Sequence, residues 1–217
     1  MLPDIFKQNK LNLMIRSTLS HRNHIKVFVA STVYNFESEL NRIYETLDNF
    51  GYDVMISHKG TIPLDSKKSN LNICLGGVNE CDVFVGFIRP DYGSGVLEPD
   101  GKSITHLEFE KAVERGMPRF ILADYRVPFA RSLIRKAEIS YKGEIIKISS
   151  ENINFQNDNI MDIRCVQLYE KMIQQNISPK DRVGHWVQSY VGLDDILLHI
   201  DAQFKYPERI KKLIDKQ

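Results

Sequence analysis

The sequence has few of the features that mark membrane proteins or nucleic-acid-binding proteins. No apolar run approaches the roughly 20 residues that a helix needs to cross a bilayer. The first residues, MLPDIFKQNKLNLMIRS, have neither the apolar region nor the cleavage site of a signal peptide. The 29 basic and 28 acidic side chains leave a net charge of +1, so there is no charge excess to attract nucleic acid. We therefore expect a cytoplasmic protein without nucleic-acid or membrane partners.

Cysteine and histidine are also sparse. Cys74, Cys81 and Cys165 have no metal-ligand spacing and are odd in number, which is typical of reduced, buried thiols. The six histidines are scattered, and the closest pair, His21 and His24, precedes the first apolar run. We expect no metal site.

Short apolar runs alternate with helical periodicity through the first half of the chain. Runs that are rich in β-branched residues and too short for helices are typical of strands buried on both faces of a sheet. We expect strands over 25–30, 52–57, 83–88 and 119–123. Apolar residues at helical spacing predict helices over 35–50, over 69–80 and from Ser103 or Thr105 to 116.

This alternation predicts an α/β fold, a three-layer open parallel sheet with helices on both faces. We divide the chain into a leader (1–24), an α/β core (25–124) and a carboxyl-terminal extension (125–217) that packs on the core. In the extension, 139–155 is ambiguous between a short strand and a loop, and 182–190 could close the sheet or cover its edge. Helices are expected over 127–136, 160–175, 194–204 and 206–217.

One helix carries the main candidate for a functional side chain. At about 100° per residue, Glu108 falls on the apolar stripe of this helix with Phe109 and Ala112. A buried carboxylate needs a partner or a function, because an unpaired buried charge is costly. Thr105 and Glu108 also fit the T-x-x-E pattern of a capping box. In that case the Glu108 side chain would only accept a hydrogen bond from the backbone N–H of the N-cap residue. The sequence leaves both interpretations open.

Three motifs together carry a resemblance to a known family. They are VFVAST at 27–32, R-x-x-Y-G at 89–93 and S-x-T-x-x-E-[FY] at 103–109, and they are followed by DIRCVQLYEKMI and RVGHWVQSY. In this order they resemble a TIR-like family described as a domain of unknown function, found alone in bacteria or fused to STAND-type ATPases. The resemblance covers about 25–204 and implies a flavodoxin-like, TIR-like fold.

The resemblance also implies an activity. TIR enzymes cleave the nicotinamide glycosidic bond of NAD, or cyclise the product into a signal, and use one Glu on a helix beside the cleft. The related nucleoside deoxyribosyltransferases carry a Glu on a comparable helix, and Glu108 is the matching position here. Many bacterial members serve in antiphage defence and act as oligomers. The chain lacks the Trp-Cys-x-x-Glu context of ordinary TIR domains and has a longer carboxyl-terminal half.

One carboxylate is sufficient for the chemistry of this activity. Breaking the bond creates an oxocarbenium-like ribose, which a nearby carboxylate stabilises. We expect Glu108 to stay ionised, because the helix macrodipole favours a negative charge near the N-terminus. His106 points about 160° away from Glu108 on the helix and should not share its substrate.

Backbone turns and one cation are the candidates for binding the nucleotide. We expect the turn of Ala30, Ser31 and Thr32 and the loop of Gly93, Ser94 and Gly95 to offer backbone N–H groups to the phosphates, and we expect Thr105 to belong to the same substrate-binding site. Arg89 is the candidate cation for the phosphates, and Phe36 or Tyr92 is the candidate for stacking on a base. NAD would be the substrate, and no cofactor is expected.

Two other functions remain open at this stage. The first is a non-catalytic TIR-like module for signalling or protein interaction, in which Glu108 only caps a helix. The second is a nucleotide N-glycosidase of the deoxyribosyltransferase type. For the enzyme we expect a homo-oligomer on activation, with a possible effector or sensor protein as partner.

Overall fold

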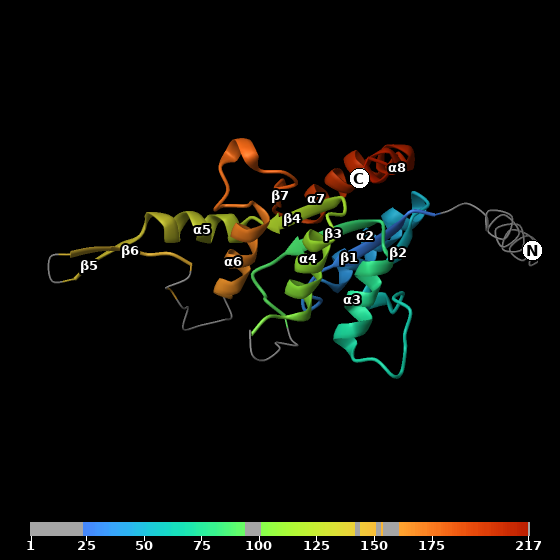
Figure 1. Cartoon of the computed structure of the whole chain (residues 1–217), viewed down its shortest axis with the longest axis horizontal. Coiled ribbons are helices and arrows are strands. Elements are labelled where there is room, and N and C mark those ends of the chain that lie inside the picture. Colours follow the sequence, from blue (N-terminus) through green and yellow to red (C-terminus); the bar gives the residue numbers. More distant parts are fainter. Residues whose placement is uncertain (1–23, 94–100, 142–143, 151–152, 154–160, 217) are drawn as a thin grey trace, which may run out of the picture.

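The computed structural model describes residues 24–93, 101–141, 144–150, 153 and 161–216. In these residues the centre of the molecule is a sheet of five parallel strands in the order β2-β1-β3-β4-β7 (Figure 1). The strands are β1 (Lys26–Ala30), β2 (Asp53–Met55), β3 (Val83–Ile88), β4 (Arg119–Asp124) and β7 (Val187–Tyr190). The predicted open parallel α/β sheet is therefore confirmed, with an order of the flavodoxin-like type.

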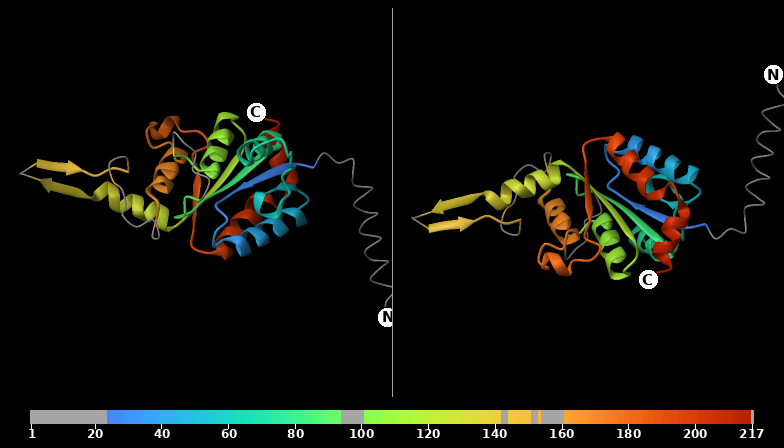
Figure 2. Two further views of the ribbon diagram at one scale, coloured as in Figure 1. Left: turned by 90° about the horizontal axis from the view of Figure 1, so that it is seen from below. Right: turned by 90° about the horizontal axis from the view of Figure 1, so that it is seen from above.

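Helices cover both faces of the sheet and make three layers (Figure 2). One face packs against α2 (Glu37–Asn49), α7 (Leu193–Phe204) and α8 (Pro207–Ile214). The other packs against α3 (Asn70–Glu80), α4 (Ile104–Glu114), α5 (Arg126–Lys136) and α6 (Ile163–Met172). Since both faces are covered, the strands are apolar on both sides, which is why they read as continuous apolar runs.

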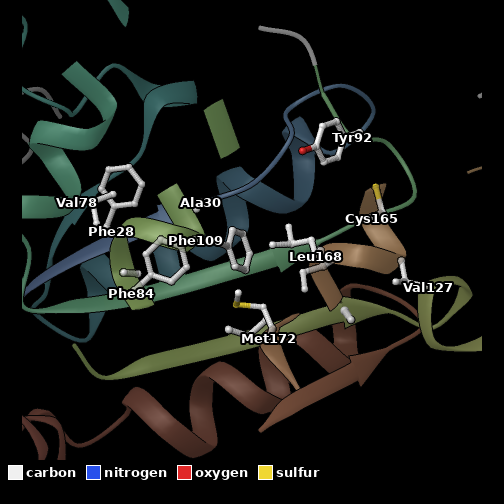
Figure 3. Close-up of a cluster of buried hydrophobic side chains, with 14 of the residues drawn as sticks. Phe28, Ala30, Val78, Phe84, Tyr92, Phe109, Val127, Cys165, Leu168 and Met172 are labelled. Atoms are coloured by element: carbon white, nitrogen blue, oxygen red, sulfur yellow. The ribbon is translucent and has the colours of Figure 1, made fainter. Parts of the chain in front are cut away.

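The core between the sheet and α4 is built from aromatic rings (Figure 3). Phe28 of β1 stacks on Phe84 of β3 with ring centroids 6.1 Å apart, and Phe109 of α4 meets Phe84 edge-on at 5.1 Å. Gly86 of β3 makes room for this arrangement, because a Cβ there would lie 2.6 Å from Phe109 Cε1. Helix α4, which carries Glu108, therefore packs directly on β3, the central strand of the sheet.

The carboxyl-terminal extension contributes to the sheet itself. β7 pairs in parallel with β4, so the segment expected at 182–190 adds an edge strand over its last four residues, and the sheet extends beyond the core expected at 25–124. In the first part of the ambiguous segment, β5 (Glu138–Tyr141) and β6 (Glu144–Lys147) pair antiparallel and project from the body beyond α5 (Figure 1). Two short 3₁₀ turns, η1 (Ser57–Lys59) and η2 (Pro179–Asp181), lie in connecting loops.

Residues 1–23 of the leader are not described. Within the part of the chain that the structure describes, no helix is long and apolar enough to cross a membrane.

Candidate active site

A cavity of about 410 Å³ opens over the carboxyl ends of β1 and β3. β1 and β3 are neighbours, and the chain leaves β1 toward β2 on one side and leaves β3 toward β4 on the other. This reversal is the topological switch point at which open α/β sheets bind ligands. The described lining residues are Ser31, Thr32, Val33, Tyr34, Ser57, Gly60, Ile62, Leu64, Asn70, Ile73, Cys74, Gly93, Ile104, Thr105 and Glu108.

Glu108 lies in the wall of this cavity, on the buried side of α4. Its side chain is 4% exposed. The N-cap of α4 is Ser103, whose hydroxyl accepts a hydrogen bond from the backbone N–H of His106 at 3.2 Å. Because Ser103 and not Thr105 begins the helix, Glu108 lies beyond the third helical position that a capping box requires. The capping interpretation of Glu108 is therefore wrong.

Burial dominates the electrostatics of Glu108. Desolvation raises the pKa of its carboxyl to about 8, and the Cys74 thiol on the same cavity wall opposes this shift only in part. The expectation that the macrodipole keeps Glu108 ionised is therefore wrong, because the desolvation penalty outweighs the dipole, which is typically worth 1 kcal/mol or less. At neutral pH most of the free protein carries a protonated Glu108.

Glu108 is also the only Asp, Glu, Lys, Arg or His among the described residues that line the cavity. The remaining lining groups are hydroxyls, one amide, one thiol, backbone and apolar side chains. A carboxylate there faces no competing charge in the described wall.

Of the expected binding residues, four lie with Glu108 around the cavity. Ser31 and Thr32 follow β1, Gly93 follows β3, and Thr105 opens α4. Gly93 has a φ of +88°, and a Cβ there would lie 2.6 Å from Thr32 Cγ2, so glycine lets the two loops meet closely. Ala30 is buried in the sheet core and does not line the cavity. Ser94 and Gly95 lie outside the described residues.

Arg89 is placed behind the cavity wall. Its guanidinium is 6% exposed and donates to the backbone oxygens of Thr32 at 3.2 Å and Tyr34 at 2.8 Å. It also pairs with Asp91, with 3.2 Å between Nη2 and Oδ2. These bonds brace the loop after β1 from within, so the structure does not bring the guanidinium to the cavity as a phosphate ligand.

The two aromatic residues expected to stack on a base are also in the interior. Phe36 packs on Phe87 with centroids 5.6 Å apart and is 5% exposed. Tyr92 is 6% exposed, and its hydroxyl lies 2.6 Å from Nδ1 of His106. Neither ring lines the cavity.

His106 faces away from Glu108, as its position on the helix predicted. Besides Tyr92, it contacts Glu110, with 3.3 Å between Nε2 and Oε1. Burial lowers the pKa of this imidazole. Glu110 also pairs with Lys102 and Lys171, so the cluster joins α4 to α6 outside the cavity. No group of three metal-ligating side chains occurs within the described ranges.

Sequence reasoning missed the residues that reach the cavity from other loops. Tyr34 is 70% exposed at the cavity wall, and Leu64 is 79% exposed. Asn70 and Ile104 begin α3 and α4, so two helix N-termini face the same space. The sequence signals the two N-termini only through their Ser caps at 69 and 103, and nothing in it marks Tyr34.

Comparison with known proteins gives a family without an assigned function. A family model described as "Domain of unknown function (DUF4062)" matches residues 26–176, which include the first four strands and the whole described cavity wall. No curated protein has a significant sequence match to the chain.

Proposed function

The chain belongs to the DUF4062 family, and from this premise we propose that it is a TIR-like NAD-processing enzyme that cleaves the nicotinamide glycosidic bond. The observation that carries the proposal is the isolated Glu108 carboxyl in the wall of a cavity at the topological switch point of the sheet. NAD is the proposed substrate, and the product is ADP-ribose or its cyclised form.

Glu108 supplies the one charge that the reaction needs. When the bond between C1′ of the ribose and N1 of nicotinamide breaks, both bonding electrons go to the ring and positive charge develops on the ribose. The ionised Glu108 stabilises this charge, and water or an internal nucleophile then attacks C1′ and loses a proton. The pyridinium ring leaves as a neutral molecule, so no general acid is required. Its positive charge also favours the ionised Glu108 when substrate binds.

The rest of the cavity wall suits the other parts of a dinucleotide. The first turns of α3 and α4 present backbone N–H groups and the positive ends of two helix dipoles to the diphosphate. Tyr34 offers an exposed ring on which a base can stack. This division assigns the chemistry to Glu108, and recognition to the first turns of α3 and α4 and to Tyr34 in the loop after β1.

The test is nicotinamide release by purified protein at high concentration, followed by chromatography. We expect release by the wild type and its loss in Glu108→Gln with an unchanged circular dichroism spectrum. The matched control is Glu114→Gln, an exposed carboxylate on the same helix that pairs only with Lys111 among described residues and does not line the cavity. Equal rates in wild type and Glu108→Gln would refute the assignment.

A second candidate, an N-glycosidase acting on nucleosides or nucleotides, is favoured by the protonation state of Glu108. With a pKa of about 8, the carboxyl is mostly neutral at pH 7 and can protonate an uncharged leaving base. The two candidates predict opposite pH dependence. Release of nicotinamide should rise as pH passes through about 8, whereas release of an uncharged base should fall.

Self-association belongs to the same proposal, as does a role in bacterial antiphage defence. The β5–β6 hairpin projects from the body, and Ile145 and Ile146 on β6 are 68% and 46% exposed. A two-stranded hairpin is only marginally stable alone, so a second copy of the chain is a suitable partner. Light scattering with and without NAD tests this, and a monomer under both conditions would contradict it.

A further inference from the structure

The outer face of α5 carries a row of exposed apolar side chains. Tyr125 is the N-cap of the helix, and Phe129 and Leu133 follow it at four-residue spacing. All three are exposed, Phe129 at 60% and Leu133 at 56%. Residues four apart share one face of a helix, so these side chains form a stripe. A single exposed apolar side chain is ordinary on a protein surface, but a contiguous row indicates an interaction site.

The charge along this stripe is positive. α5 contains four basic residues and no acidic one. Arg126 lies three residues before Phe129, and Lys136 lies three residues after Leu133, so both share the stripe. Lys136 is exposed and has no ion pair among the described residues. The outer face of α5 is therefore both apolar and basic, and we call Tyr125, Arg126, Phe129, Leu133 and Lys136 the α5 face.

The outer face of α7 has the opposite charge. Asp194, Leu198 and Ala202 lie at four-residue spacing and are exposed, Leu198 at 71%. Asp195 is also exposed and borders the same stripe, and the helix contains no Lys or Arg. The outer face of α7 is therefore apolar and acidic, and we call Asp194, Asp195, Leu198 and Ala202 the α7 face.

The dipoles of the two helices account for only part of this pattern. Basic residues in the last turn of α5 and acidic residues in the first turn of α7 complement the dipoles of their own helices. That effect gives no reason for apolar side chains beside the charges. Phe129, Leu133 and Leu198 together leave unused the burial of three large apolar side chains, each worth roughly 1.5–3 kcal/mol.

We infer that the α5 face of one copy of the chain binds the α7 face of the next copy. The two faces cannot meet within one chain, because α5 packs on one side of the sheet and α7 packs on the other. In an antiparallel pair of helices, the last turn of α5 with Lys136 lies beside the first turn of α7 with Asp194 and Asp195. The apolar side chains of both faces then bury one another.

This contact is heterologous, because each copy uses two different faces. A bound copy still has its second face open, so assembly continues beyond two chains to a ring or a filament. One helix against another is a small interface, in the weak class that buries less than about 1,200 Å² in total. We therefore expect association that rises with protein concentration and weakens at high salt.

The contact goes beyond the proposed function, because no residue of either face lines the cavity. It is also distinct from association through the β5–β6 hairpin. The parent protein for every sample therefore carries Ile145→Thr and Ile146→Thr, which remove the exposed apolar side chains of the hairpin.

Two double variants, each with one face lost, test the pairing. Phe129→Gln with Leu133→Gln removes the apolar row of the α5 face. Asp194→Lys with Leu198→Lys reverses charge on the α7 face and removes its largest apolar side chain. All four positions are exposed, so both variants should keep the circular dichroism spectrum of the parent. Val183→Gln is the control, because it removes an exposed apolar side chain from a loop outside both helices.

Sedimentation equilibrium over a series of concentrations measures the mass in solution. The parent and Val183→Gln should grow with concentration past twice the 25.1 kDa of one chain, whereas each double variant alone should stay at the mass of one chain. An equimolar mixture of the two double variants should form a complex of two chains and nothing larger, because only one intact pair of faces remains.

A parent protein that stays a single chain, or that stops at two chains, would overturn the inference. A mixture of the double variants that forms no two-chain complex would also overturn it. If a double variant does not fold, Leu133→Gln or Leu198→Lys alone replaces it with the same expected direction.

The Glu108→Gln substitution in the parent separates this inference from the proposed function. This variant should assemble like the parent and release no nicotinamide. Assembly of a parent that releases no nicotinamide would support the contact and count against NAD cleavage. Release by a parent that stays a single chain would overturn the contact and leave the assignment of Glu108 intact.

Discussion

Arg89 stacks on Phe36, with its guanidinium carbon 4.6 Å from the ring centroid. The same guanidinium donates to the backbone of the loop after β1, including the carbonyl of Asn35 at 3.4 Å. Asn35 has a φ of +54°, a left-handed conformation that is unusual for residues other than glycine. Arg89 therefore holds a strained turn whose other residues form one wall of the cavity.

Arg89→Lys should destabilise the protein by about 1–3 kcal/mol, because an ammonium cannot replace the planar fork of donors. Urea denaturation measures the free energy of unfolding. The control is Arg135→Lys on the exposed side of α5, which should change it by less than about 0.5 kcal/mol. Equal stability of the two variants would show that Arg89 does not brace the loop.

The rate of nicotinamide release should depend on the ionisation of Glu108. Since the carboxylate is the active form and the pKa of the free carboxyl is about 8, kcat/KM should rise about tenfold per pH unit below that value and level off above it. The measurement is kcat/KM from pH 6 to 9.5. A profile that is flat, or that falls through this range, would contradict the role of Glu108 as a carboxylate.

Glu108 should also make stability depend on pH. Its carboxyl has a folded-state pKa raised from 4.5 to about 8, so its neutral form contributes stability that is complete below pH 4.5 and lost as pH rises to about 8. The Glu108→Gln variant has no carboxyl to ionise at this position, so it should not lose this stability as pH rises. At pH 9 the variant should be more stable than the wild type, by an amount on the order of a few kcal/mol, and the difference should shrink toward pH 5. Thermal unfolding at both pH values tests this, and a difference independent of pH would argue against a buried neutral carboxyl.

Tyr34→Ala should weaken nucleotide binding, because an exposed ring beside the cavity contributes about 1–3 kcal/mol when it stacks on a base. We expect KM to rise about tenfold or more with little change in kcat, and Tyr34→Phe to retain the wild-type KM. Tyr206→Ala is the control, since Tyr206 is 65% exposed and lies away from the cavity. An unchanged KM in Tyr34→Ala would remove Tyr34 from the binding site.

Gly86→Ala should destabilise the protein by roughly 1–3 kcal/mol, because its Cβ would lie 2.6 Å from both Phe109 Cε1 and Phe84 Cε1. Gly76→Ala in α3 is the matched control. A Cβ there meets nothing within 4 Å, and alanine should stabilise the helix by up to about 1 kcal/mol. The denaturation midpoint should fall for Gly86→Ala and rise for Gly76→Ala. An unchanged midpoint for Gly86→Ala would mean that Phe109 can move aside.

The order of the elements could be predicted from the sequence because each depends on local patterns. The apolar runs at β1, β3 and β4 and the helical spacing of α4 placed Glu108 on a buried face, and the structure agrees. The functions of Arg89, Phe36 and Tyr92 could not be predicted in this way. In a sequence, a cation or an aromatic ring near the end of a strand gives the same pattern whether its side chain contacts a ligand or stabilises a loop.

The sequence by itself determined the parallel sheet and the position of one buried carboxyl, because both follow from periodicities of two to four residues. Only the tertiary structure decided that Ser103 caps α4, that Cys74 lines the same cavity as Glu108 and that Tyr34 lies at the cavity. It also decided that Glu108 is largely neutral at pH 7, because the desolvation of a carboxyl depends on neighbours brought together from α3, α4 and the loops after two strands.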